Sequence, residues 1–593
     1  MLKRKGSKKS GNNNRRIQIL IVATIIIVGA IIFRLFWIQV LNHDYYYARA
    51  QDQYTIYDEL VPDRGEIFVE DKLGNLYPVA TNQKVHLVYA DPRKIDDPKD
   101  VAVKLAPLLL NEDAVDEENN EEEVLVSTED EIMKRLKDKN DPYEPLKRGV
   151  NDETWKKIDE LNLPGIYSAA SKSRYYPEGE LASHVIGYVG INENSWLGQY
   201  GLEGHYENEL KGSGGFFETE QDALGNWISA GDRQVVEATD GDSLVLTIDR
   251  RAQYESEAIL KELVEARGAE SGSVIVMHPK TGEILVMGNY PNFDPNKYNE
   301  VEDINVFQNA SIYKAWEPGS VFKVITMGSA MNVGAVTANT YYTDKGSEEI
   351  AGYTIKNFDG QARGNINMTD VLVQSINTGV MFAEKQMGHS AFNEYVQKFG
   401  FGELTKIDLD TEAKGDVSPL AQEKDIYAAT ASFGQGITVT PIQMLAAVSA
   451  IANKGTLIKP YVVKKIISPD GTETETQPEQ IRDVLSPGIA STLGAMMVSV
   501  IENGHQTAAG VDGYLVAGKT GTAQVASSSG NGYDPNKTIH SFVGFAPLSD
   551  PEILLFIKID KPTSGQFAAN TISPYFGRLM KFLLEYYQVT PDR

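Results

Sequence analysis

A serine and a lysine stand three residues apart in this sequence, at Ser320 and Lys323, directly after a Pro-Gly pair. The Pro-Gly pair ends the preceding segment, and the apolar run 321–327 predicts a helix. Ser320 would lie at the helix N-terminus, where unpaired N–H groups and the helix dipole stabilise a developing anion. Lys323 would lie on the same helix face, and burial beside a second cation would lower its pKa until it can deprotonate the serine. The pair therefore indicates nucleophilic catalysis by a serine.

The Ser-x-x-Lys pattern alone is weak evidence, because a chain of 593 residues contains it by chance. Ser311 and Lys314 also match, but a helix starting at Ser311 would meet Pro318 after barely a turn, so we interpret that match as accidental. Taken by itself, Ser320 is better explained as a helix-capping serine.

Two further short elements favour the catalytic interpretation. Ser375 and Asn377 follow an apolar stretch, and Lys519 begins a Lys-Thr-Gly-Thr segment inside a strand predicted over 515–525. Lys280-Thr281-Gly282 repeats the lysine pattern, but it lies between two apolar strands and predicts a hairpin turn.

Residues 513–520 also satisfy the phosphate-binding pattern GxxxxGK[ST]. That motif needs a loop between a strand and a following helix. Here the central residues predict a strand, and residues 521–532 contain too much Gly and Ser for a helix. We therefore do not expect a nucleotide site.

Composition excludes several other chemistries. The net charge of −26 disfavours binding to nucleic acid, which needs a basic face. The absence of cysteine excludes disulfides, thiolate metal sites and a cysteine nucleophile. The eight histidines are scattered singly, so we predict neither a metal site nor any cofactor.

The N-terminus predicts a membrane anchor. Residues 1–16 contain seven Lys or Arg and no acid, and the apolar run 17–40 is long enough to span a bilayer as a helix. Its one charged residue, Arg34, lies near the far end and can reach the headgroups. The basic flank predicts a cytoplasmic tail, with everything after residue 40 outside the cell membrane. The rival interpretation is a signal peptide cleaved near Ala48-Arg49-Ala50, but the apolar run is too long and that triplet lies too far beyond it.

A change of pattern near residue 245 predicts two parts outside the membrane. We expect a non-catalytic part over 41–245 and an α/β catalytic domain over 246–593 that alternates strands and helices. The run 112–131 carries eleven acidic residues and no basic one, which predicts a solvated loop. A calcium site there would lack the glycine and ligand spacing of a known calcium loop.

With its three motifs in this order, the chain resembles the class B penicillin-binding proteins, the serine D,D-transpeptidases of cell-wall synthesis. The resemblance extends to the segments 433–441 and 541–547. It also includes four segments of the non-catalytic part, at 64–67, 174–177, 181–187 and 201–203. It implies a transmembrane helix, an elongated α+β pedestal of the dimerisation type, and a transpeptidase domain with an antiparallel sheet flanked by helices.

The resemblance also implies roles for individual residues. Ser320 would be the nucleophile and Lys323 its base, while Ser375 would relay a proton to the departing D-Ala. Asn377 would hold the substrate amide, and the backbone N–H groups of Ser320 and Thr522 would form the oxyanion hole. The substrate carboxylate would be bound by the segment Lys519, Thr520, Gly521 and Thr522.

The expected substrate is a peptidoglycan stem peptide ending in D-Ala-D-Ala, and β-lactams would acylate Ser320 in its place. The alternatives are a membrane-anchored β-lactamase and a β-lactam-binding sensor or scaffold without transpeptidase activity. The resemblance favours a division role over an elongation role. It implies partners in the membrane, namely a polytopic glycosyltransferase and proteins of the division or elongation complex.

Overall fold

The computed structural model describes residues 11–43, 55–110, 121–192, 195–220, 233–422, 424–527 and 532–593. Most of the basic tail, the Ala48-Arg49-Ala50 triplet and the first part of the acidic run lie outside the described residues. The chain divides into two compact units. One contains Met1–Pro62 and Gly212–Asp240, and the other contains Asp63–Lys211 and Gly241–Arg593.

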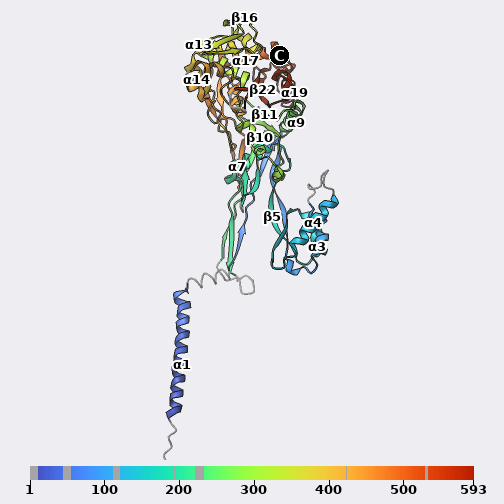
Figure 1. Ribbon diagram of the computed structural model, residues 1–593, viewed down its shortest axis with the longest axis vertical. Coiled ribbons are helices and arrows are strands. Elements are labelled where there is room, and N and C mark those ends of the chain that lie inside the picture. The colour runs from blue at the N-terminus through green and yellow to red at the C-terminus, as the bar shows by residue number, and fades with distance from the viewer. Residues whose placement is uncertain are drawn as a thin grey trace, which may run out of the picture. The chain divides into compact units, whose positions relative to one another are not determined.

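The first unit holds the apolar N-terminal helix. Helix α1 (Gly11–Phe36) continues into a π-helical turn, η1 (Trp37–Leu41), and Figure 1 shows it as one long rod. The stretch Arg15–Leu41 has a mean hydropathy of 2.8, and none of its apolar window is buried inside the protein. By length and composition this helix can cross a membrane, as predicted. The same unit holds a three-stranded antiparallel sheet of β1 (Thr55–Leu60), β8 (Gly215–Glu220) and β9 (Arg233–Val236).

The second unit contains a seven-stranded sheet that joins both predicted parts. Strand β10 (Ser243–Asp249) pairs in parallel with β2 (Ile67–Glu70) on one side and antiparallel with β18 (Val463–Ile467) on the other. The strands beyond these two are β3 (Leu76–Ala90), β4 (Glu144–Val150), β5 (Ile166–Tyr175) and β19 (Glu473–Glu475). The boundary predicted near residue 245 therefore falls inside a central strand of this sheet.

The loop predicted over 112–131 is wrong for its second half, which belongs to helix α4 (Glu121–Arg135). Val124 and Ile132 of α4 are buried, and Ile132 packs in a small core with α3 (Pro98–Leu109) and α5 (Asp152–Glu160). The acidic side chains obscured this apolar spacing in the sequence. Shorter elements complete this region: α6 (Ser183–Ile186), β6 (Tyr188–Asn192), β7 (Ser195–Gln199), α7 (Gly201–His205) and α8 (Glu207–Leu210).

A five-stranded antiparallel sheet forms the centre of the rest of the second unit. Its order is β12 (Ile284–Tyr290), β11 (Ser271–Met277), β23 (Ile553–Asp560), β22 (Tyr533–Ala546) and β21 (Ala517–Ala526). Alternate residues face opposite sides, since Val274 and Val276 belong to one core and Ile275 and Met277 to another. Both faces are therefore covered by helices, which confirms the predicted antiparallel sheet with helical flanks.

Helices from different parts of the chain cover the two faces of this sheet. On one side lie α9 (Arg250–Arg267) and α19 (Ser573–Tyr586), whose apolar faces pack on the sheet. On the other side the core includes α11 (Lys323–Asn332), α16 (Pro441–Ala452) and α17 (Pro487–Asn503). The helices α12 (Met368–Val373), α13 (Asn377–Met387), α14 (His389–Lys398) and α15 (Asp425–Ser432) extend that side.

Two short two-stranded antiparallel sheets lie between α11 and α12 in sequence. Strand β13 (Tyr341–Asp344) pairs with β16 (Gly364–Asn367), and β14 (Ser347–Ile350) pairs with β15 (Tyr353–Lys356). We call residues 341–367 the hairpin insertion.

The structure agrees with the interpretation of the two misleading motifs. Lys280-Thr281-Gly282 lies in the turn between the antiparallel strands β11 and β12. The residues after Lys519 continue strand β21, which pairs with β22, so no helix follows the GxxxxGK[ST] pattern.

Candidate active site

Ser320 lies in a single turn of 3-10 helix, η6 (Gly319–Phe322), that leads directly into α11. In a 3-10 helix residues i and i+3 lie above one another, so Ser320 and Lys323 share a face, as the spacing predicted. The turn is anchored by the Gly319 N–H, which donates to the Gly434 carbonyl over 2.9 Å. Gly319 has a φ of +57°, a conformation that favours glycine.

Lys323 is fully buried and makes three hydrogen bonds with the 375–377 loop. Its Nζ lies 2.6 Å from the Ser375 carbonyl oxygen, 2.7 Å from Asn377 Oδ1 and 3.3 Å from Ser375 Oγ. Within the described residues no hydrogen bond joins Lys323 to the Ser320 hydroxyl. Hydrogen bonds between a general base and its nucleophile commonly tighten only when substrate binds.

The 375–377 loop connects α12 to α13 and is held in a strained conformation. Ser375 has a φ of +55°, in the left-handed region that a residue with a side chain rarely adopts. Asn377 is the first residue of α13, and its Nδ2 donates to the Lys356 carbonyl over 2.9 Å. That contact turns Asn377 Oδ1 toward Lys323.

Lys519 reaches the same loop from strand β21. It is fully buried, and its Nζ donates to Ser375 Oγ over 3.0 Å and to the Thr520 carbonyl over 3.2 Å. The Ser375 hydroxyl thus lies between two lysine amines. The structure therefore brings Lys323, Ser375, Asn377 and Lys519 into one cluster.

The rest of the Lys-Thr-Gly-Thr segment divides between the two faces of β21. Thr520 is buried, and its hydroxyl accepts from Gln506 Nε2 over 2.8 Å, away from the amine of Lys519. The structure thus does not bring the Thr520 hydroxyl to Ser375. Thr522 Oγ1 accepts from the Ala568 N–H over 3.1 Å.

Gly521 allows η6 to pack closely against β21. A Cβ at Gly521 would lie 2.6 Å from Ser541 Oγ and 2.9 Å from the Pro318 carbonyl oxygen. The Pro318 carbonyl belongs to the backbone just before Ser320, so any side chain at residue 521 would displace the turn that carries the serine.

The buried cluster lowers the pKa of both lysines. Burial lowers the pKa of Lys323 well below its usual value, and the nearby charge of Lys519 lowers it further. Burial also lowers the pKa of Lys519, to about 7. Burial and the charge of Lys519 thus both favour the neutral form of Lys323, which is the form that a general base needs.

The chance match at Ser311 and Lys314 has no such geometry. Ser311 lies in the four-residue helix α10 (Ala310–Tyr313), is buried, and donates to Asn289 Oδ1 over 2.9 Å. Lys314 instead contacts Asp560 Oδ2 at 3.1 Å. The prediction that a helix starting here ends within about a turn is confirmed.

Sequence reasoning missed the polar groups that hold the 375–377 loop from behind. Asp344, Asn357 and Thr378 are buried and bonded to one another. Asp344 and Asn357 lie in the hairpin insertion, far from Thr378 in sequence. The one feature of the sequence that could have pointed to this group is the position of Thr378 directly after Asn377.

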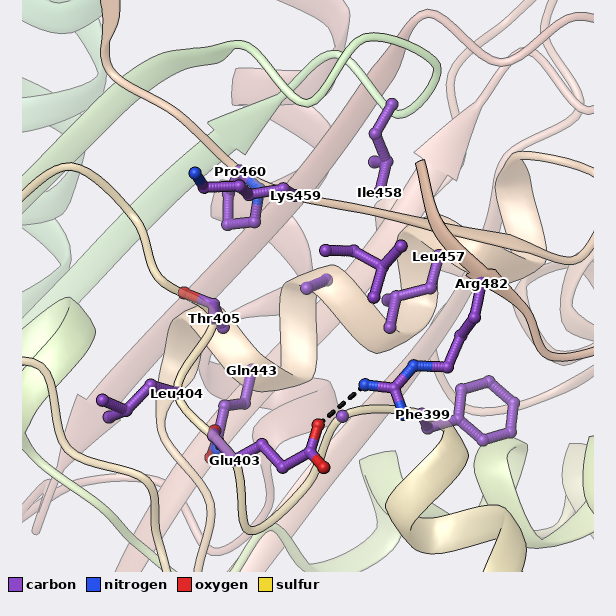
Figure 2. A pocket seen from close by; sticks show the side chains of 13 residues that line it. Phe399, Glu403, Leu404, Thr405, Gln443, Leu457, Ile458, Lys459, Pro460 and Arg482 are labelled. Atoms are coloured by element: carbon purple, nitrogen blue, oxygen red, sulfur yellow. Dashed lines mark hydrogen bonds and ion pairs between the residues drawn. The ribbon is translucent and has the colours of Figure 1, made fainter. Parts of the chain in front are cut away.

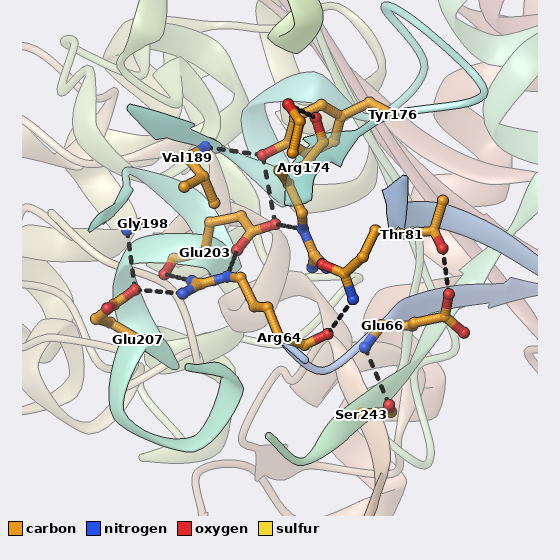
Figure 3. Close-up of polar contacts among 12 residues, drawn as sticks. Arg64, Glu66, Thr81, Arg174, Tyr176, Val189, Gly198, Glu203, Glu207 and Ser243 are labelled. Carbon is orange, nitrogen blue, oxygen red and sulfur yellow. Dashed lines mark hydrogen bonds and ion pairs between the residues drawn. The ribbon is translucent and has the colours of Figure 1, made fainter. Parts of the chain in front are cut away.

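In the non-catalytic part, residues from the family-like segments meet in a buried ion cluster (Figure 3). Glu203 is fully buried and accepts from Arg64 Nε over 2.7 Å and from Arg174 Nε over 2.6 Å. Burial alone would raise the pKa of Glu203, but the two guanidinium groups lower it overall. Arg64 also pairs with Glu207 at 2.7 Å. The cluster joins three segments that are distant in sequence.

A pocket lies elsewhere in the second unit (Figure 2). Phe399, Leu404 and Leu457 give it apolar walls, and Arg482 donates to Glu403 over 2.7 Å at its edge. None of the predicted site residues lines it, so it is separate from the lysine cluster.

Two family models match the chain. The model for the penicillin binding protein transpeptidase domain matches residues 272–581, which contain every candidate site residue. The model for the penicillin-binding protein dimerisation domain matches residues 59–246.

Similar proteins extend over nearly the whole chain. Stage V sporulation protein D of Bacillus subtilis is 32% identical over 581 residues, which cover 96% of this chain and 86% of the relative. Peptidoglycan D,D-transpeptidase FtsI of Escherichia coli is 28% identical, with 97% of this chain and 92% of the relative covered. The crystal structure of penicillin binding protein 3 from Mycobacterium tuberculosis, complexed with aztreonam, shares the fold, with a TM-score of 0.68 and 23% identity over 90% of this chain and 98% of that one.

Proposed function

Because this chain belongs to the penicillin-binding protein transpeptidase family, we propose that it is a membrane-anchored peptidoglycan D,D-transpeptidase that works through an acyl-enzyme on Ser320. The observation that carries the proposal is the convergence of Lys323 and Lys519 on the Ser375 hydroxyl, next to the turn that bears Ser320. The Escherichia coli relative, which is named a peptidoglycan D,D-transpeptidase, supports the choice of reaction.

In the first half-reaction, Ser320 Oγ attacks the carbonyl carbon of the penultimate D-Ala and gives its proton to neutral Lys323. The negative charge on the carbonyl oxygen is met by the backbone N–H groups of Ser320 and Thr522. Loss of one such donor typically slows a reaction by about 10²–10³-fold. The C–N bond then breaks, and the proton passes from Lys323 through Ser375 to the amine of the departing D-Ala.

The hydrogen bonds of Lys323 support its role as a base. A neutral amine has two N–H donors and one lone pair, and the acceptors at 2.6 and 2.7 Å can take both donors. The lone pair is then left for a hydroxyl proton. Ser375 Oγ, at 3.3 Å, is placed to take that proton onward.

Lys519 provides the positive charge for a substrate that ends in a carboxylate. Its pKa of about 7 rises when the carboxylate binds beside it, because an opposite charge favours the protonated amine. The bound substrate thereby keeps Lys519 charged, and that charge keeps Lys323 neutral. In the second half-reaction the amine of a neighbouring stem peptide attacks the acyl carbonyl carbon. The C–O bond to Ser320 then breaks, and the proton lost by the amine returns to Ser320 Oγ through Lys323.

We further propose that residues 1–16 lie in the cytoplasm, with residues 17–40 as the anchor and the remainder outside the cell membrane. The basic flank supports this orientation. Within the outer part, residues 41–245 would serve as a pedestal and 246–593 as the transpeptidase domain. We propose that the enzyme acts in division, beside a polytopic glycosyltransferase, and the sporulation protein among its relatives adds spore formation as a second setting.

The test is to incubate the detergent-solubilised full chain with a labelled penicillin and locate the adduct by mass spectrometry of the peptides. We expect the adduct on Ser320. An adduct on another residue, or none, would overturn the proposal.

A further inference from the structure

The loop that carries Ser375 and Asn377 is clamped from both ends by the hairpin insertion. Before the loop, Arg363 Nε donates to Gln374 Oε1 over 3.0 Å. Within it, Asn377 donates to the Lys356 carbonyl over 2.9 Å. After it, the Thr378 N–H donates to Asn357 Oδ1 over 3.2 Å.

One buried carboxylate organises these contacts. Asp344 is 2% exposed, and its Oδ1 accepts from the Thr378 hydroxyl over 2.7 Å. Both carboxylate oxygens accept from Asn357 Nδ2 over 3.1 Å, and Oδ2 also accepts from the Arg363 N–H over 2.8 Å. Asp344 thus joins all the clamping segments to the residue that follows Asn377.

The Thr378 hydroxyl is the group that links this carboxylate to the catalytic loop. It has one proton, and the shorter contact assigns that proton to Asp344. Its oxygen is then free to accept from the Tyr342 hydroxyl, 3.1 Å away. Burial would raise the pKa of Asp344, but the hydrogen bonds from Thr378 and the backbone lower it overall, so the group stays ionised.

These contacts explain how Ser375 is kept in its strained backbone conformation. A non-glycine residue stays in the left-handed region only where its surroundings over-determine it, and such strain is concentrated at functional sites. The Ser375 carbonyl and hydroxyl both contact Lys323, so relaxation of the loop would move two of the three groups of this loop that contact the amine.

We infer that Asp344, acting through Thr378 and Asn357, is a positioning group that holds Ser375 and Asn377 against Lys323 and thereby sets the rate of acylation. The inference rests on the proposed function. It assigns the hairpin insertion a catalytic purpose, since three of its segments hold the loop that organises the general base. Misplacement of a catalytic group by about 1 Å can cost about 10²-fold in rate.

The decisive variant is Thr378→Val, which keeps the shape of the side chain and removes the hydroxyl. Thr378→Ser restores the hydroxyl, and Thr354→Val is the matched control, because Thr354 lies in the same insertion but contacts Glu349 rather than the loop. Each full-length variant is mixed with labelled penicillin over a range of concentrations. Three quantities are measured: the dissociation constant, the first-order acylation rate constant and the final labelled fraction.

We expect Thr378→Val to lower the acylation rate constant at least about tenfold, with the labelled fraction unchanged and the dissociation constant changed less than the rate constant. Thr378→Ser and Thr354→Val should stay within about twofold of the unmodified chain. A merely structural role would reduce the labelled fraction and leave the rate constant of the remaining protein intact, and that result would overturn the inference.

A second variant, Asp344→Asn, covers the case in which the valine is tolerated by local repacking. It keeps the shape but places an amide N–H group where a backbone or side-chain donor now points, so it should slow acylation in the same way. Acylation at the original rate by both variants would overturn the inference. Failure of the unmodified chain to become labelled would instead overturn the proposed function, and this inference with it.

Discussion

Lys519 Nζ lies 3.0 Å from the hydroxyl oxygen of Ser375, although 144 residues separate the two in sequence. Strand β21 provides the lysine, and the loop between α12 and α13 provides the serine. Because Lys323 reaches the same hydroxyl from α11, one oxygen connects the proposed carboxylate-binding cation to the proposed general base. The predictions below follow from this arrangement and from the elements that support it.

Ser320→Ala should abolish covalent labelling by penicillin, because it removes the attacking oxygen. Ser311→Ala is the matched control, since Ser311 belongs to the accidental Ser-x-x-Lys match and is buried in a hydrogen bond to Asn289. Gel fluorescence after incubation with a fluorescent penicillin measures both. Labelling of Ser320→Ala at the original level would refute the assignment of the nucleophile.

Lys519→Met should shift the acid limb of the pH profile of the acylation rate constant to higher pH. The positive charge of Lys519 lowers the pKa of Lys323, so its removal raises that pKa, and more alkali is needed to make the base neutral. The measurement is the first-order acylation rate constant at saturating penicillin, from about pH 5 to pH 10. An unchanged acid limb would show that the two amines do not interact.

The same variant should change how stability depends on pH. The pKa of Lys519 is about 7 in the folded chain and 10.5 for an ordinary solvated lysine, so between these values the unfolded chain binds more protons and folding is favoured by rising pH. Lys519→Met lacks this contribution. Its stability relative to the unmodified chain should therefore be highest below about pH 7 and decline toward pH 10.5. Thermal denaturation of both proteins across this range gives the difference, and a difference independent of pH would contradict the assigned burial.

Gly521→Ala should slow acylation without loss of the fold. Its Cβ would lie 2.9 Å from the Pro318 carbonyl oxygen, so the backbone just before Ser320 must shift. Gly488→Ala is the control, because nothing lies within 4 Å of the Cβ it would add. The acylation rate constant should fall for the first variant and stay unchanged for the second. Equal rates would show that the turn tolerates displacement.

Glu203→Gln should destabilise the non-catalytic part strongly, because it leaves the buried Arg174 without its counter-charge and leaves Arg64 with Glu207 alone. Removal of one partner of a buried pair typically costs about 3–5 kcal/mol. Glu255→Gln breaks an exposed pair with Arg251 and should have almost no effect. The two are compared by thermal denaturation followed by circular dichroism, and similar losses would contradict the distinction.

Much of the candidate active site could be predicted from the sequence, because its residues belong to short patterns with local meaning. The Pro-Gly pair marked the start of the Ser320 turn, and the strand predicted over 515–525 is β21 (Ala517–Ala526). The turn at Lys280-Thr281-Gly282 was predicted from the apolar strands on either side of it.

What could not be predicted depends on tertiary contacts. Nothing local marks Asp344, whose partners Asn357 and Thr378 are 13 and 34 residues away. A carboxylate-binding role was expected for Thr520. Because successive side chains of a strand face opposite sides, its hydroxyl instead points away from the amine of Lys519 and contacts Gln506. Helix α4 could not be recognised in the sequence, because its many acidic residues are typical of a solvated loop. Only a few buried residues, such as Val124 and Ile132, hold it against its neighbours.

The place of β10 between β2 and β18 limits how the chain can be shortened for expression. A fragment that begins at residue 246 would keep only the last residues of β10. Most of β18 would then be an unpaired edge strand with its backbone exposed. Such edges recruit other chains and cause aggregation. A soluble catalytic fragment must therefore begin upstream of Ser243, and one that also retains Ile67–Glu70 would keep both neighbours of the strand in place.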